Sequence, residues 1–193
     1  MPPKVKVSEE EVVRTALEIA RTRGADAINA RSVAEAIGCS TQPIFRSFDT
    51  VEELVEATRR EAYRAYFGFI EKEVASGKYP QYKAFGMAYV RFANEEKELF
   101  KFLFMCDRGG VVKSNAQTET EDFEASVQMI MENNAVSREV AERMHLEMWC
   151  VVHGIGTMLA TSFQELSYED ISGILSDVYR GLQVVHSVQE RKG

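Results

Sequence analysis

The stretch that decides the fold is VAEAIGCSTQPIFRSF, residues 33–48. A short helical pattern ends at Gly38, resumes at Ser40, and meets Pro43 within the next turn. Two short helices joined by a tight turn cross steeply only where a small side chain lies at the crossing and the turn residue tolerates positive φ. Ala34 and Gly38 meet these demands. The spacing therefore favours a helix-turn-helix over an ordinary αα-hairpin, which shares the glycine but does not need the alanine.

Apolar residues flank this turn where a small core needs them. Val33, Ile37 and Ile44 fall on the inward side of the two helices. Pro43 is compatible with the second helix because the first N–H groups of a helix have no intrahelical partner. It disfavours helical geometry at Gln42, so this helix, expected over residues 40–47, should begin one or two residues later than is usual.

Helix caps and stops extend the pattern along the rest of the chain. Ser8 and Thr50 open capping boxes, Asn29 is a further N-cap, and Ser167 with Asp170 caps the last helix. The expected helices run from the Ser8 cap to Gly24, from Asn29 to Gly38, over about 40–47, from Thr50 to Gly77, and over about 82–94, 96–105, 120–132, 137–163 and 168–188, with a loop at 106–117. The sequence thus predicts an all-α protein, in which a three-helix helix-turn-helix domain (1–52) is joined by a long helix to a C-terminal helical ligand-binding and dimerisation bundle (53–193).

Composition and charge restrict the function. The net charge of −7 argues against a general binder of polyanions, although the first 60 residues, with nine Lys/Arg and ten Asp/Glu, are almost neutral. The longest apolar runs are shorter than the roughly 20 residues of a membrane span, and the N-terminus lacks a secretory signal, so a cytoplasmic protein is expected. No catalytic motif occurs, which predicts a protein that is not an enzyme and needs no cofactor. The three cysteines show no metal or disulfide spacing; we interpret them as reduced thiols, with a redox sensor as the alternative.

Residues 8–57 resemble a domain of a known protein family. RTRGADAINARSVAEAIG (21–38), the serine-led helix after it, Phe48, and the capped fourth helix resemble the DNA-binding domain of the TetR (tetracycline-repressor) family of bacterial transcriptional regulators. WCVVHGIGTMLATSF (149–163) resembles a segment of that family's ligand-binding domains. The resemblance implies a homodimer that binds double-stranded operator DNA through its N-terminal domains and a small-molecule effector through its C-terminal domain.

The chain departs from the family at three places. The family often has tyrosine at Phe45, where its hydroxyl contacts a phosphate; phenylalanine keeps the packing and loses that hydrogen bond. Lysine is frequent where this chain has Val51, and Gly-Thr is common where Gln42-Pro43 stands. The departures at Phe45 and Val51 put two contacts with the DNA backbone in doubt.

Several residues at the start of the second short helix carry base-reading or phosphate-binding chemistry. Gln42 can bond an adenine edge, Arg46 a guanine or a phosphate, and Pro43 a thymine methyl group. For Arg46 the alternative is a solvated arginine on a helix face. The predicted DNA-binding residues are Arg31, Ser40, Thr41, Gln42, Pro43, Phe45 and Arg46.

The C-terminal part is rich in methionine and aromatic residues, most of which we assign to the core. The predicted effector-pocket residues are Phe85, Tyr89, Phe92, Phe104, Met105, Met148, Trp149 and His153. Cys150 and His153 lie one helical turn apart but lack a carboxylate partner, so no metal site is expected. Small and apolar residues at helical spacing predict a dimer interface at Gly156, Ala160, Ile174, Val178 and Leu182, with the interior of a monomer as the alternative.

These features together favour one function. The sequence predicts a ligand-responsive DNA-binding transcriptional regulator, a repressor released from a pseudo-palindromic operator by a small apolar or aromatic effector. The alternative is a helical ligand-binding or interaction protein whose helix-turn-helix no longer binds DNA. Phe45, Val51 and the sparse basic charge keep that alternative open.

Overall fold

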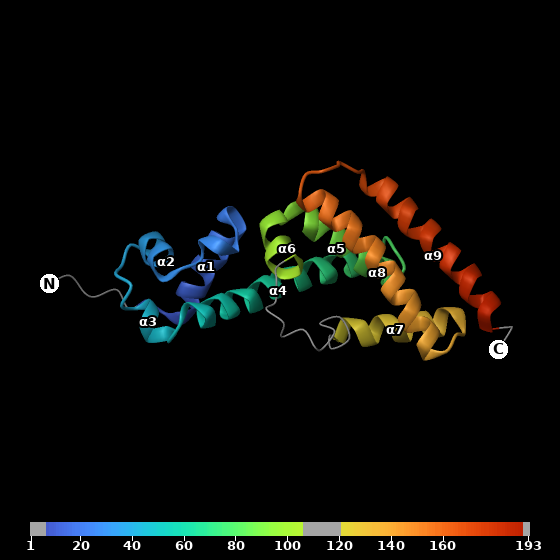
Figure 1. Cartoon of the computed structure of the whole chain (residues 1–193), viewed down its shortest axis with the longest axis horizontal. Helices are drawn as coiled ribbons and strands as arrows, with labels where there is room; N and C mark the ends of the chain where they lie inside the picture. The colour runs from blue at the N-terminus through green and yellow to red at the C-terminus, as the bar shows by residue number, and fades with distance from the viewer. Residues whose placement is uncertain (1–6, 106–120, 191–193) are drawn as a thin grey trace. The chain divides into compact units, whose positions relative to one another are not determined.

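The computed structural model describes residues 7–105 and 121–190, and within these ranges it is all-helical, without a strand (Figure 1). The helices are α1 Glu9–Arg23, α2 Ala30–Ile37, α3 Ile44–Ser47, α4 Val51–Ala75, α5 Gln81–Glu95, α6 Lys97–Phe104, α7 Glu121–Asn134, α8 Arg138–Ala160 and α9 Tyr168–Glu190, with a short 3-10 turn η1 at Ala25–Ala27. The all-α prediction is confirmed. The loop predicted at 106–117 lies outside the described residues.

The chain divides into two compact units. Of the described residues, the first unit holds 7–68 and 95–105, and the second holds 69–94 and 121–190. The boundary expected at residues 52/53 therefore falls inside the first unit, which includes most of α4 and all of α6.

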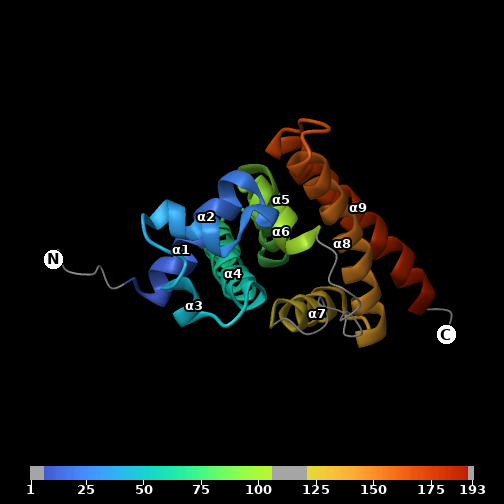
Figure 2. The same ribbon diagram turned by 60° about the vertical axis from the view of Figure 1, so that its left-hand side comes forward.

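Helix α1 is the centre of the first unit, where it packs against α2, α3 and α6 (Figure 2). Its buried face carries Val12 and Ala16, which meet the helices that bury Val33 and Ile44. Fully burying a large apolar side chain contributes about 1.5–3 kcal/mol, so a handful of such residues can hold this small unit together.

The end of α1 lets α6 approach closely. Gly24 ends the helix with φ +83°, and a Cβ atom there would lie 3.2 Å from Glu98 Oε2. Arg21 Nε donates to Glu96 Oε2 at 2.9 Å, which ties the same end of α1 to the start of α6. Farther along α6, Arg59 of α4 donates to the Phe102 carbonyl at 2.7 Å.

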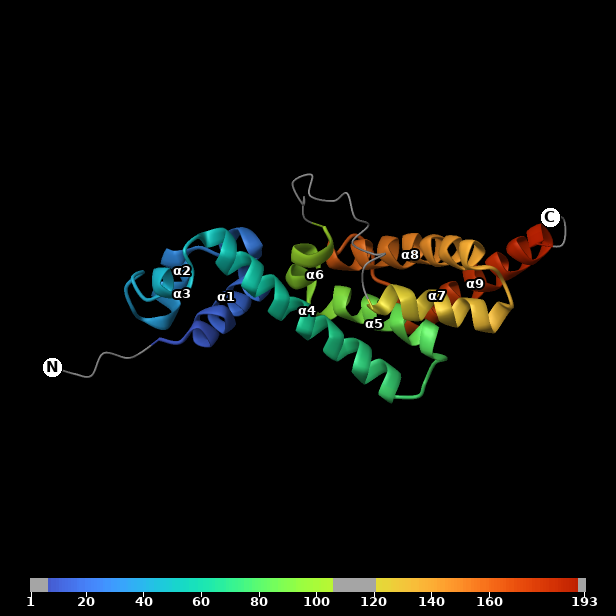
Figure 3. The same cartoon turned by 90° about the horizontal axis from the view of Figure 1, so that it is seen from below.

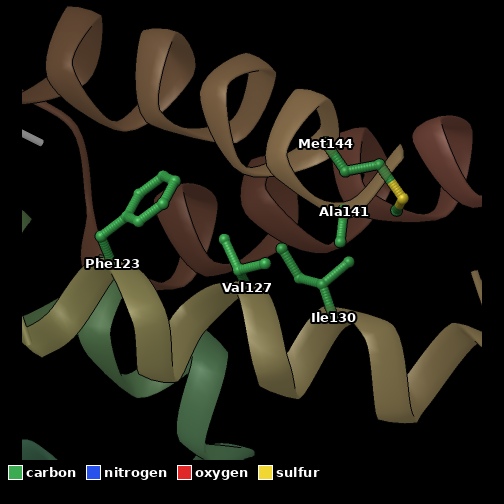
Figure 4. Close-up of a cluster of buried hydrophobic side chains, with 5 residues drawn as sticks. All are labelled: Phe123, Val127, Ile130, Ala141 and Met144. Carbon is green, nitrogen blue, oxygen red and sulfur yellow. The ribbon is translucent and has the colours of Figure 1, made fainter. Parts of the chain in front are cut away.

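In the second unit α8 packs against both α7 and α9 (Figure 3). Phe123, Val127 and Ile130 of α7 point toward Ala141 and Met144 of α8 and form its buried apolar cluster (Figure 4). Ser137 begins α8 and Ser167 caps α9, as the sequence predicts, because each serine oxygen accepts a backbone N–H three residues later.

Candidate functional site

Helix α2 is fixed at both ends. Asn29 Oδ1 accepts from the backbone N–H groups of Arg31 at 3.1 Å and Ser32 at 2.9 Å, and Ser32 Oγ accepts in return from the Asn29 N–H. Gly38 ends the helix in the left-handed region, with φ +80° and ψ +35°, and its N–H donates to the Ala34 carbonyl at 2.9 Å. Glycine is favoured there because a Cβ atom makes this conformation costly.

Helix α3 is shorter than expected and begins at Ile44, four residues after the predicted start at Ser40. Pro43 is its N-cap, with φ −59° and ψ −36°, and the N–H groups of Ile44 and Phe45 both donate to the Thr41 carbonyl. The proline therefore occupies a position where no N–H is required. The start at Ile44 is later than the delay of one or two residues that Pro43 predicts.

Burial divides α3 and the turn before it into two faces. Ile44 and Phe48 are buried and attach α3 to the first unit. Solvent reaches the other face, which carries the exposed residues Ser40, Thr41, Gln42, Phe45 and Arg46; Pro43 is half-buried, and Arg31 on α2 is exposed.

Phe45 corrects one expectation. The sequence leads to a phenylalanine that is retained for packing, yet 51% of this residue is exposed. The reason is its position directly after Ile44, which takes the inward direction on this short helix. Phe45 has no aromatic or cation contact recorded among the described residues.

Charge around α3 is mixed. Arg31 and Arg46 are exposed, but so are Glu35, Asp49 and Glu52. This surface therefore lacks the dense positive charge typical of strong non-specific binding to DNA.

Three of the predicted effector residues do come together in the second unit. Tyr89 Oη lies 2.8 Å from His153 Nδ1, and the Trp149 ring stacks on the His153 ring with centroids 4.7 Å apart and 11° between the planes. Burial lowers the pKa of His153. In the tautomer that carries its proton on Nε2, the neutral imidazole accepts a hydrogen bond from the Tyr89 hydroxyl at Nδ1.

A second tyrosine–histidine pair repeats this contact two helical turns away. Tyr82 Oη lies 3.2 Å from His145 Nδ1, with the rings of Tyr179 and Phe123 alongside. Burial lowers the pKa of His145, and burial together with the neighbouring Tyr179 raises the pKa of Tyr82. Sequence reasoning missed Tyr82. The signal was a spacing of seven residues between the tyrosines on α5 and eight between the histidines on α8.

The other predicted effector residues are elsewhere. Phe92 is fully buried, and its ring centroid lies 5.4 Å from that of Phe69. Met148 is also buried. Phe85 is half-buried on α5. Phe104 and Met105 belong to the first unit, where the Phe104 ring meets the rings of Tyr63 and Tyr66.

An open depression of about 500 Å³ lies in the second unit, and none of the eight predicted effector residues lines it. Asn134 and Gln183 are in its wall and are hydrogen-bonded to each other at 2.7 Å. His186 is 2% exposed, and its Nε2 lies 2.8 Å from Glu147 Oε2. This hydrogen bond from His186 is the main cause of the lowered pKa of Glu147.

The predicted dimer residues divide in the same way. Gly156 and Ala160 are buried inside the second unit, and half-buried Leu182 packs against its apolar cluster. These three residues make contacts within the protomer, and their role in a dimer stays a prediction. Ile174 is 38% exposed and Val178 is half-buried.

Exposed apolar residues and open glycines on α8 and α9, among them the predicted dimer residue Ile174, make up a set that we call the α8–α9 face. It comprises Leu146 and Gly154 on α8 and Ile174, Gly181 and Val185 on α9. The intervals of eight, seven and four residues keep each set on one side of its helix. A Cβ atom built on Gly154 or Gly181 would meet nothing within 4 Å.

The described ranges hold no cluster of three or more His, Cys, Asp or Glu side chains that could bind a metal ion. Cys39 is half-buried and Cys150 is exposed, both as free thiols. No helix in the part of the chain that the structure describes is long and apolar enough to cross a membrane. No protein-family model matches the chain, and no curated protein matches it.

Proposed function

We propose that this protein is a DNA-binding transcriptional regulator of the TetR type that binds a pseudo-palindromic operator as a homodimer. The observation that carries the proposal is the pair α2–α3. A capped helix ends at a left-handed glycine, and a second helix follows with its apolar side buried and its polar side in solvent. These features support a helix-turn-helix, a motif whose second helix enters the major groove.

The exposed side chains on α3 and on the turn before it have the chemistry for base recognition. Gln42 can bond both the N6 and N7 positions of adenine, and Arg46 can bond O6 and N7 of guanine or a phosphate. Thr41 and Ser40 can donate to phosphate oxygens, and Arg31 on α2 can neutralise a further phosphate.

The α8–α9 face supports the dimer. A second copy related by a two-fold axis would bury Leu146, Ile174 and Val185 against the same residues of the partner, as an isologous interface requires. Gly154 and Gly181 would allow the four helices to approach closely. Two copies of α3 would then contact half-sites about 34–36 Å apart.

The effector belongs to the second unit in this proposal. The effector would bind beside the half-buried, stacked Trp149–His153 pair, whose rings suit a small aromatic molecule. The Tyr89 hydroxyl is buried and holds the His153 ring in place from the other side of their hydrogen bond. Release from the operator would follow if the effector binds more tightly to a dimer whose two α3 helices do not match the half-site spacing.

A mobility-shift assay with the protein and a DNA fragment from its own promoter tests the residue assignment. Gln42→Ala and Arg46→Ala should each weaken sequence-specific binding at least about fivefold, since a good bidentate base contact contributes about 1–3 kcal/mol. Arg64→Ala is the matched control, because Arg64 is 73% exposed on α4 and pairs only locally with Glu61. If the two α3 variants bind as tightly as the control variant, these residues do not read the operator.

A second candidate function is a helical ligand-binding or interaction protein in which α2–α3 does not bind DNA. The exposed carboxylates of Glu35, Asp49 and Glu52 favour this second function. Their negative charge would repel the DNA phosphates that Arg31 and Arg46 would bind. The salt dependence of DNA binding separates the two functions. With two arginines per half-site, the proposal expects log K to fall with log salt at a slope of about −3 to −4. The absence of salt-sensitive DNA binding would favour the second candidate.

A further inference from the structure

The open depression of the second unit is separate from the Tyr89–His153–Trp149 cluster, none of whose residues lines it. The end of α7, the first half of α8 and the last turns of α9 form its wall. No carboxylate and no aromatic ring is among the described residues that line it. The wall combines amide, apolar and basic side chains, among them Asn134, Gln183, Met144, Val184, Arg180 and His186.

His186 brings a buried atom without a partner to this wall. The side chain is 2% exposed, and its Nε2 lies 2.8 Å from Oε2 of Glu147, which does not line the depression. The other ring nitrogen, Nδ1, is buried and makes no hydrogen bond to any residue that the structure describes. Burying a polar atom without a hydrogen bond costs free energy, so such atoms are uncommon and mark places where a ligand can bind.

Glu147 determines which hydrogen bond remains for Nδ1. The hydrogen bond from His186 is the main reason that the pKa of this carboxyl is lowered, and Arg143 Nε, at 3.3 Å, acts in the same direction. The Nε2–H of His186 therefore donates to an ionised carboxylate. With a proton on Nδ1 as well, the same ring donates to a second anion that enters from the depression.

Gln183 and Arg180 add donors from the same part of α9. Gln183 Nε2 donates one hydrogen to Asn134 Oδ1 at 2.7 Å, and Asn134 Nδ2 donates to Tyr179 Oη at 2.8 Å. These bonds hold the Gln183 amide in place and leave its second N–H for a ligand. Arg180 is 75% exposed and lies 3.5 Å from the equally exposed Asp177, a pair that contributes little and leaves the guanidinium able to turn over the depression.

We propose that the depression binds a small aliphatic carboxylate. Its carboxylate accepts hydrogen bonds from His186 Nδ1, Gln183 and Arg180, which are stronger than bonds to a neutral group. Its aliphatic body packs against Met144 and Val184, and the lack of a ring in the described wall gives an aromatic ligand nothing to stack on. Because Nδ1 is covered, the ligand reaches it when exposed side chains of the wall, such as Arg180 and Val184, change rotamer. This site is additional to the proposed effector site and does not depend on DNA binding.

Isothermal titration of the full chain with hexanoate tests the proposal, and hexanamide is the matched ligand that has the same length and no charge. We expect saturable binding of hexanoate and binding of hexanamide that is at least about tenfold weaker, because a hydrogen bond to a charged group contributes more than one to a neutral group. The nitrogen-15 chemical shift of His186 Nδ1 should change on addition of hexanoate, while that of His153 should not.

Two pairs of variants locate the ligand. His186→Gln keeps a donor for Glu147 and removes the second ring nitrogen, so hexanoate should bind at least about tenfold more weakly; His153→Gln makes the same change at the proposed effector site and should leave the affinity unchanged. Arg180→Ala should weaken binding about threefold or more, whereas Arg64→Ala, which removes an equally exposed arginine paired three residues away, should not. The exposed position of Arg180 keeps this second test valid if His186→Gln does not fold.

The outcomes decide the proposal without reference to DNA. No saturable binding of hexanoate overturns it, and so does hexanamide that binds as tightly. Binding that is lost in His153→Gln and kept in Arg180→Ala places the ligand beside Trp149 and also overturns it. Hexanoate that binds through His186 and Arg180 in a protein without sequence-specific DNA binding leaves this inference standing and refutes only the proposed function.

Discussion

Acidification should destabilise the second unit through His145. At neutral pH this imidazole is uncharged, its Nδ1 lies 3.2 Å from Tyr82 Oη, and Phe123 lies against its ring. Burial lowers its pKa, so the folded state resists the proton that the unfolded state accepts. A protonated imidazole can only donate at Nδ1, so Tyr82 Oη would then be the acceptor of this hydrogen bond.

Proton linkage gives the sign and the size of this change in the free energy of unfolding with pH. An unfolded histidine titrates near pH 6.5, so the contribution of His145 to stability is complete above that pH. As the pH falls below the unfolded value, the unfolded state takes up a proton first, and the free energy of unfolding drops by at most about 1.4 kcal/mol per pH unit. This drop continues until the folded pKa is reached. His153, whose pKa is also lowered by burial, adds a smaller loss because more of it is in water.

Urea unfolding between pH 5 and 7.5, followed by circular dichroism, measures this slope. His145→Gln keeps an acceptor for Tyr82 and removes the titrating group, so its slope below pH 6.5 should be shallower than that of the wild type by up to about 1.4 kcal/mol per pH unit. The lowered pKa of Glu147 acts in the same direction at lower pH, and the window above pH 5 limits its contribution. Equal slopes for the variant and the wild type in this window would refute the reasoning.

Three further changes test other parts of the structure. Gly38→Ala should cost about 1–2 kcal/mol in urea unfolding because of its φ of +80°, while Gly38→Asn should cost less; equal stability of all three proteins would contradict the left-handed cap. Gly181→Glu should convert the proposed dimer to a folded monomer in light scattering, whereas Gly68→Glu, at a helical glycine that is equally open, should not; a dimer that persists in Gly181→Glu excludes the α8–α9 face. Glu73→Gln should destabilise the protein by about 1–3 kcal/mol, because it removes a 93%-buried carboxylate that lies 2.7 Å from Arg91 Nε; an unchanged melting temperature would show that this ion pair contributes nothing.

Helix ends could be read from the sequence because their determinants are local. Ser8, Asn29 and Ser167 each accept the backbone N–H expected of an N-cap, and Gly24 and Gly38 end their helices at positive φ. A cap is decided by residues within one turn, so the pattern contains what is needed. Even the delayed start of α3 followed from the conformational restrictions of a single proline.

Which face of a helix is buried depends on partners that are distant in sequence, and here the sequence was a weaker guide. Gly156 and Gly154 are two residues apart and look equivalent as small residues, yet the first is buried and the second is open. Phe45 was expected to pack and is half-exposed. The aromatic residues of the predicted effector pocket likewise divide among the core, the Tyr89–His153–Trp149 cluster and the first unit, because burial alone does not distinguish a cavity lining from a core.

The central claim is that α2–α3 reads a specific DNA sequence in a two-fold arrangement. Selection of bound sequences from a pool of random duplex DNA tests recognition, symmetry and dimerisation in one measurement. The account predicts an enriched site with two inverted half-sites centred about 34–36 Å apart, and its enrichment should be lost with Arg46→Ala and kept with Arg64→Ala. A pool that remains random after repeated selection, or an enriched site without inverted repeats, would contradict it.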